Sequence, residues 1–108
     1  MIDWTRLHTL RSDIGEEDFA DVAFLFVSEI EDHLKGLRGA EDTATVADFH
    51  FLRGSASNLG FVALVEACER AEAACIGGTR PDIDGIANIF HKSVAEVAPE
   101  IPELAEAA

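Results

Sequence analysis

Residues 45–60 of the chain read TVADFHFLRGSASNLG, and this stretch has the period of an amphipathic helix. Thr45 followed three residues later by Asp48 resembles a capping box, although Asp42 or Thr43 could also cap a helix that runs to about Leu59. At 100° per residue the apolar side chains gather on one stripe. That stripe consists of Thr45, Phe49, Leu52, Ala56 and Leu59. The segment is therefore predicted to be a helix over residues 43–59 that buries one face.

Helical spacing continues on both sides of this segment. A short helix is predicted over residues 3–11, with Asp3 as its cap, and a long one over residues 16–38. After Gly60, further helices are predicted over residues 61–76 and from residue 82 or 84 to residue 98. Pro99 ends the last helix. Residues 99–108 form a tail that we expect to be frayed or loosely docked.

Short connections between helices favour antiparallel neighbours. The predicted fold class is therefore all-α, an antiparallel up-down four-helix bundle with an extra short N-terminal helix. The 108 residues suit one domain, with a core at about residues 3–98. Cys68 and Cys75 are seven residues apart, about 10 Å along a helix, which is too far for a disulfide. We expect both cysteines to be small buried residues of a reducing compartment.

The charge of the chain excludes several classes of partner. Its 21 acidic and 8 basic residues give a formal charge of −13. Such a chain repels nucleic acid and anionic membrane surfaces. The sequence contains neither an apolar run of ~20 residues nor a secretory signal pattern. We therefore expect a cytoplasmic protein that binds no nucleic acid and no membrane. No group of His, Cys, Asp or Glu residues has the spacing of a metal site.

The side of this helix that faces away from the apolar stripe carries an unusual group of residues. His50 lies about 140° from the centre of the stripe and is predicted to point outward. Arg53 brings a cation to its neighbourhood, and Ser57 lies two turns further on the same side. Gly54 costs roughly 1 kcal/mol relative to alanine inside a helix, so we interpret it as open space beside the imidazole. This combination suits a phosphoryl group bound to the ring.

Two further residues have alternative interpretations. Glu72 falls within the apolar stripe of the following helix, where a carboxylate needs a partner. It could accept a hydrogen bond from Nδ1–H of His50 and leave Nε2 as the nucleophile, or it could extend to solvent or pair with Arg53 or Arg70. Phe51 flanks His50 on the outward side. It could form a docking patch for a partner with Ala47 and Gly54, or it could pack against a neighbouring helix.

Residues 50–60, HFLRGSASNLG, resemble the signature His-x-Leu-Lys-Gly-Ser-Ala/Ser-x-x-Leu-Gly of histidine-containing phosphotransfer (HPt) domains. The order of helices over roughly residues 2–98 also resembles the family. The resemblance implies a four-helix bundle in which His50 accepts a phosphoryl group from an aspartyl phosphate or a kinase. Arg53 stands where the family has lysine and would stabilise the phosphate. Glu72 matches a position where the family often has Gln or Glu facing the histidine.

The resemblance also implies partners. These are a response-regulator receiver domain, which exchanges the phosphoryl group through an aspartate, and a sensor or hybrid histidine kinase. It implies no cofactor of its own, because Mg²⁺ would belong to the receiver. Without a kinase domain the chain would be a monomeric phosphoryl carrier, not an enzyme. The alternative is a degenerate HPt-like module that binds a receiver or kinase without carrying phosphate, which the presence of His50 and Gly54 disfavours. A metal- or cofactor-binding bundle is also disfavoured, because no inward Glu-x-x-His pair is present.

Overall fold

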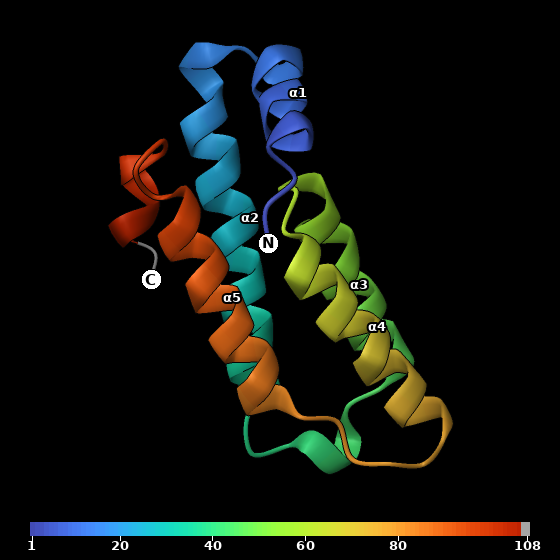
Figure 1. The fold of residues 1–108 in the computed structure, drawn as a ribbon. Coiled ribbons are helices and arrows are strands. Elements are labelled where there is room, and N and C mark those ends of the chain that lie inside the picture. Colours follow the sequence, from blue (N-terminus) through green and yellow to red (C-terminus); the bar gives the residue numbers. More distant parts are fainter. Residues whose placement is uncertain (107–108) are drawn as a thin grey trace.

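The computed structural model describes residues 1–106 and is built from helices. They are α1 (Trp4–Ile14), α2 (Glu16–Leu37), α3 (Val46–Asn58), α4 (Val62–Ile76) and α5 (Ile83–Val97), with short 3-10 turns at Glu41–Thr43 and Pro102–Glu106. Figure 1 shows α2 to α5 running alternately up and down the bundle, while α1 covers the end where α3 turns into α4. The predicted all-α bundle with an extra N-terminal helix is confirmed.

The helix boundaries follow local signals. Asp3 caps α1 by accepting a hydrogen bond from Arg6 N. α1 continues three residues beyond its predicted end, because the chain first turns at Gly15, which has a φ of 100°. α3 begins three residues later than predicted, because Glu41–Thr43 form a separate 3-10 turn. The largest side chains of the core are fully buried. They include Phe49 from α3, Phe61 at the start of α4 and Phe90 from α5.

The C-terminal tail packs against the bundle, so the prediction of a core that ends at residue 98 is wrong. Ile101 and Leu104 are buried as completely as the central residues. Ile101 N donates to the carbonyl of Val97, which turns the chain back after α5. The 3-10 turn Pro102–Glu106 then lies against α2 and α5. Leu104 is therefore part of the core, while residues 107–108 lie outside the described part of the chain.

The two cysteines are free, as predicted. Cys68 is buried, and this burial raises the pKa of its thiol to about 12, which makes the thiol unreactive. Cys75 is only half-buried, and its thiol donates a weak hydrogen bond to the carbonyl of Ala44. Among the described residues, no helix has the length and apolar character needed to cross a membrane.

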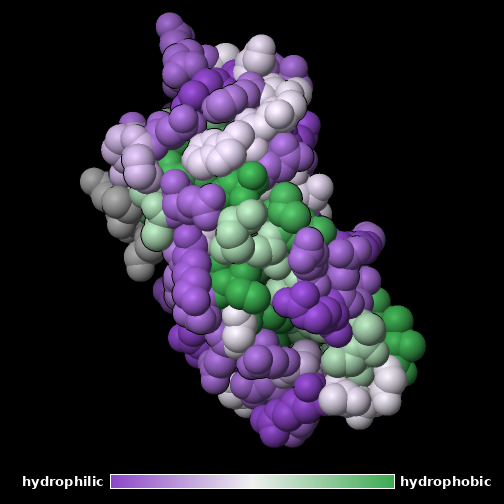
Figure 2. All heavy atoms as spheres, viewed as in Figure 1, coloured by the Kyte–Doolittle hydropathy of each residue, from purple (hydrophilic) through white to green (hydrophobic). Residues whose placement is uncertain are grey.

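Apolar residues gather in the middle of the face that α4 and α5 present, with hydrophilic residues on either side (Figure 2). A groove of about 250 Å³ between these two helices is lined largely by apolar residues, together with Arg70, Arg80 and Asp82. None of the predicted site residues lines this groove. The α4–α5 face is therefore separate from the outward side of α3.

The turn between α3 and α4 requires glycine at position 60 for two reasons. Gly60 has a φ of 73°, a backbone conformation that other residues adopt only with strain. A Cβ atom at this position would also lie 2.5 Å from the carbonyl oxygen of Asp3. The N-terminal residues approach closely because Asp3 N donates to Gly60 O at 2.7 Å and Ile2 forms an isolated antiparallel bridge with Phe61. Gly60 thus fixes α1 to the end of α3.

We predict that Gly60→Ala lowers the free energy of unfolding by at least about 2 kcal/mol. The alanine would be held in a left-handed backbone conformation, and its Cβ would collide with the carbonyl oxygen of Asp3. The measurement is urea denaturation followed by circular dichroism. Gly36→Ala is the matched control, because a Cβ at Gly36 meets nothing within 4 Å. As an exposed position inside α2, it should gain roughly 0.5–1 kcal/mol. Equal effects at the two glycines would contradict the prediction.

Candidate functional site

α3 has two distinct faces. Phe49, Leu52 and Ala56 are buried, whereas His50, Gly54 and Ser57 are exposed. The predicted outward direction of His50 is therefore confirmed. The buried face also includes Ser55, which the apolar stripe did not predict.

The surface around His50 is open along α3. A Cβ atom added to Gly54 would meet nothing within 4 Å. Ala47, one turn before His50, is exposed as well. His50 therefore projects between positions that carry little or no side chain, and the interpretation of Gly54 as open space agrees with this geometry.

Arg53 lies between His50 and two carboxylates of α4. Its Nη2 atom is 2.8 Å from Nδ1 of His50. Its Nε atom is 3.2 Å from Oε1 of Glu72, and its Nη1 atom is 3.8 Å from Oε2 of Glu69. About a third of the Arg53 side chain is exposed. The guanidinium thus joins the imidazole to the neighbouring helix.

This contact determines which ring nitrogen of His50 carries a proton. A guanidinium only donates hydrogen bonds, so Nδ1 of His50 must accept one. A neutral imidazole in this arrangement carries its proton on Nε2. Nδ1 is therefore occupied by Arg53, and Nε2 is the ring nitrogen left for a partner.

The prediction that Glu72 accepts a hydrogen bond from Nδ1–H of His50 is wrong. The long guanidinium side chain fills the space between α3 and α4, so Glu72 contacts Arg53, as the alternative interpretation proposed. The Glu72 side chain is only 16% exposed. Within the described part of the chain its Oε1 atom has no aligned hydrogen-bond donor, so its contact with Arg53 is an ion pair without good hydrogen-bond geometry.

Phe51 is partly covered by α2. Its ring stacks on that of His33, with centroids 4.9 Å apart and planes 26° apart, and the residue remains 43% exposed. Phe51 therefore packs on a neighbouring helix, as one interpretation proposed, and still presents apolar surface beside His50. Its place in a docking patch stays a prediction. Sequence reasoning missed His33. Its contact with Phe51 depends on the register of α2 against α3, which the sequence alone does not give.

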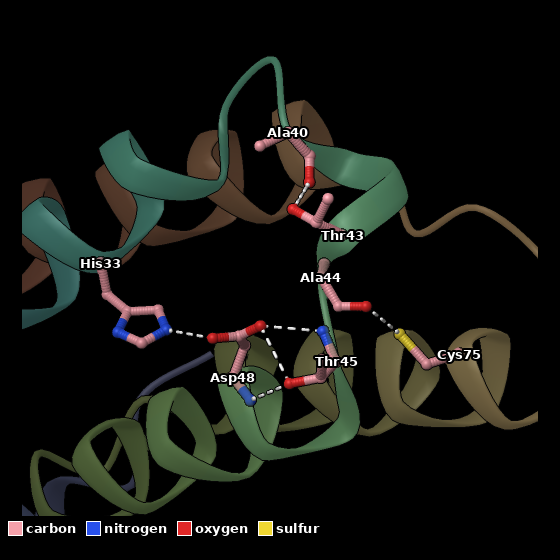
Figure 3. A network of polar contacts seen from close by, with 7 residues as sticks. All are labelled: His33, Ala40, Thr43, Ala44, Thr45, Asp48 and Cys75. Atoms are coloured by element: carbon pink, nitrogen blue, oxygen red, sulfur yellow. Dashed lines mark hydrogen bonds and ion pairs between the residues drawn. The ribbon is translucent and has the colours of Figure 1, made fainter.

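A polar network fixes the beginning of α3 to α2 (Figure 3). The predicted capping box is confirmed, since Asp48 N donates to Thr45 Oγ1 and Thr45 N donates to Asp48 Oδ2. The second carboxylate oxygen of Asp48 lies 3.0 Å from Nε2 of His33. Thr43 is not the cap; its hydroxyl donates to Ala40 O within the preceding turn. His33 therefore contacts both the cap of α3 and the ring of Phe51.

The other histidines differ from His50 in their electrostatic surroundings. His33 faces Asp48, His91 lies 3.0 Å from Glu31, and His8 lies 3.5 Å from Glu100. His50 instead contacts a cation, the guanidinium of Arg53. Each of the other three histidines contacts a carboxylate. Among the residues that the structure describes, no group of His, Cys, Asp or Glu could hold a metal ion.

A comparison with protein-family models finds the Hpt domain over residues 21–107. The match includes α3, α4, α5 and most of α2, whereas α1 precedes it. No curated protein and no solved structure matches the chain.

The capping network yields a prediction with a defined pH dependence. Burial opposes ionisation of Asp48, but hydrogen bonds from Thr45 and His33 outweigh it and hold the pKa of Asp48 below its ordinary value. A carboxylate of this kind stabilises the fold above its unfolded pKa of about 3.9 and loses that contribution as pH falls through the folded-state pKa. Asp48→Ala should therefore cost about 1–2 kcal/mol at pH 7.

The measurement is the unfolding free energy of Asp48→Ala and wild type from pH 7 to pH 3. The difference should stay constant down to about pH 4 and narrow below it. Asp32→Asn, an exposed change on α2, serves as the control and should stay within about 0.5 kcal/mol of wild type. A difference that widens as pH falls would contradict the assignment.

Proposed function

The chain belongs to the Hpt domain family, and on this premise we propose that it carries a phosphoryl group on His50 and exchanges it with the aspartate of a response-regulator receiver domain. Hpt domains serve phosphotransfer in phosphorelays. The observation that best supports His50 as the acceptor is its exposed imidazole beside Gly54, with a guanidinium at Nδ1. A sensor or hybrid histidine kinase would be the original source of the phosphoryl group.

In the proposed transfer, Nε2 of His50 attacks the phosphorus of an aspartyl phosphate. The new N–P bond forms as the P–O bond to the partner's carboxylate breaks, and the carboxylate leaves with the electron pair. Nε2 needs a free lone pair for this attack, so its proton must first move to Nδ1 through solvent. That shift requires Arg53 to leave Nδ1. The open backbone at Gly54 leaves space for an in-line approach.

The phosphoryl group itself would draw Arg53 away from the ring. A phosphoryl dianion accepts charge-assisted hydrogen bonds that are stronger than one to a neutral ring nitrogen. Arg53 would thus change partners, from Nδ1 of His50 in the resting protein to phosphoryl oxygens during transfer. Glu72 would hold the guanidinium near both positions through its ion pair with Nε. Glu72 would then be a positioning residue that acts through Arg53.

Phe51, Ala47, Gly54 and Ser57 would form the surface that the receiver covers. Phe51 supplies exposed apolar area next to His50. Ala47, Gly54 and Ser57 are exposed and have small side chains or none, so they leave room for a partner around the imidazole. The Mg²⁺ that an aspartyl phosphate site uses would be held by the receiver. The chain itself would then need no cofactor.

We predict that His50→Gln abolishes phosphorylation by a phosphorylated receiver domain. The wild-type protein should gain an acid-labile, base-stable phosphate, because a phosphohistidine has these properties. His91→Gln is the matched control, since His91 pairs with Glu31 between α5 and α2. Phosphorylation of His50→Gln at the wild-type rate would refute the assignment. Binding of a receiver without any phosphate on the wild-type protein would favour the non-catalytic module instead.

A double-mutant cycle tests the role of Glu72. Glu72→Ala alone should slow phosphoryl transfer about three- to tenfold, because Arg53 loses its ion pair. In an Arg53→Ala background the same change should have little further effect, since Glu72 would then have no cation to hold. Rapid-quench kinetics with a phosphorylated receiver give the four rate constants. Equal effects of Glu72→Ala in both backgrounds would contradict an action through Arg53.

A further inference from the structure

α1 and the α3–α4 turn enclose a surface hollow on the same side of α3 as His50. The hollow has a volume of about 240 Å³. It is lined by Asp3, Arg6, Ser57, Gly60, Val62 and Val65. Val62 is 40% exposed, so part of the lining is apolar surface open to solvent. The hollow thus combines apolar surface with one cation, Arg6, and with the carboxylate of Asp3, which caps α1.

The hollow lies within reach of any partner that covers His50. Ser57 follows His50 by two helical turns, about 10 Å along α3, and the bare Gly54 lies between them. A standard interface covers about 800 Å² on each partner, which corresponds to a disc about 16 Å in radius. A receiver centred on His50 therefore extends over Ser57 and the edge of the hollow.

Arg6 is fixed in position and its charge is not neutralised by an ion pair within the described residues. Its Nη2 atom donates to Oδ1 of Asn58, the last residue of α3. The carboxylate of Asp3 caps α1 instead of pairing with the guanidinium. Four other arginines contact carboxylates, namely Arg11, Arg38, Arg53 and Arg80. Among the described residues, Arg70 also has no ion pair, but it is exposed and no hydrogen bond holds its side chain in place. Arg6 is therefore a positioned cation that can bind an anionic group from outside.

We propose that α1 gives this chain a partner-selecting subsite, in which the hollow takes an apolar side chain of the receiver and Arg6 binds a carboxylate next to it. The proposal rests on the proposed function and adds a specificity residue to it. A chain with a formal charge of −13 repels an acidic partner surface over most of its own surface. Arg6 provides positive charge on the side where phosphoryl exchange would occur, whereas Arg53 on the same side is already paired with Glu72 and Glu69. Asp3 and Arg6 precede the matched region, so the family match does not cover the part of this subsite that α1 and its cap supply, whereas its other lining residues lie within the match.

The experiment compares two variants with one control. Arg6→Glu reverses the charge, and Val62→Trp fills the hollow while leaving the Arg6–Asn58 contact in place. Arg70→Glu is the control, because Arg70 is an exposed arginine on α4 that lines the separate α4–α5 groove. Each protein is phosphorylated with phosphoramidate, a small donor that needs no docking surface. Transfer to a panel of purified receiver domains from the source organism is then measured.

Both variants should lose at least tenfold in kcat/KM toward the receiver that wild type prefers, mainly through a higher KM. Phosphoramidate labelling of His50 and the thermal unfolding midpoint of Val62→Trp should remain at wild-type values, and Arg70→Glu should transfer normally. Wild-type transfer by both variants overturns the subsite while the proposed function stands. An equal loss of phosphoramidate labelling also overturns it, because the defect would then lie at His50. If wild type exchanges no phosphate with any receiver, the proposed function itself fails, and the subsite fails with it.

Discussion

The structure depends on the rotation of α3 about its own axis. One side of this helix must bury Phe49 and Leu52, and only at that rotation does His50 point to solvent. The rotation is fixed at both ends. The capping box at Thr45, joined to α2 through His33, holds the first turn, and the left-handed Gly60 ends the last. A turn of 100° would place the next residue in the position of His50, so the geometry of the site follows from these two anchors.

The surroundings of His50 show how an acidic chain keeps one cation beside one imidazole. In a protein with a formal charge of −13, several arginines are paired with carboxylates, and the other histidines each contact one. Arg53 reaches the ring because its partner, Glu72, is nearly buried on α4 and holds Nε while Nη2 remains directed at His50. A guanidinium can do this because its donors point in several directions, whereas an ammonium is a single point charge. Arginine at position 53 therefore has a structural role that the lysine of the resembled signature would not fill in the same way.

Periodicity and caps were sufficient to predict the helices, because each depends on residues close in sequence. Asp3, the Thr45–Asp48 box and Gly60 mark real boundaries. The partner of Glu72 could not be predicted in this way, since the register of two antiparallel helices decides which long side chains meet. The burial of Ile101 and Leu104 was missed for a related reason. Two apolar residues after a proline form no helical pattern, and only the shape of the bundle shows a place for them.

In the proposed function, the position of α1 would separate the choice of partner from the transfer step. The proposed chemistry depends on α3 and α4, which carry His50, Arg53 and Glu72. α1 contacts the end of α3 through Arg6, which donates to Asn58, and its cap Asp3 is bonded to the Gly60 turn, about two helical turns from the imidazole. Leu7 and Leu10 of α1 also pack into the common hydrophobic core. His50 and Arg53 contact each other and α4, so exposed residues on α1 can change without altering these contacts. With this arrangement, substitutions on α1 would change which receiver binds without changing the residues that perform the transfer. Such substitutions would affect the stability of the fold only through contacts at one end of the bundle.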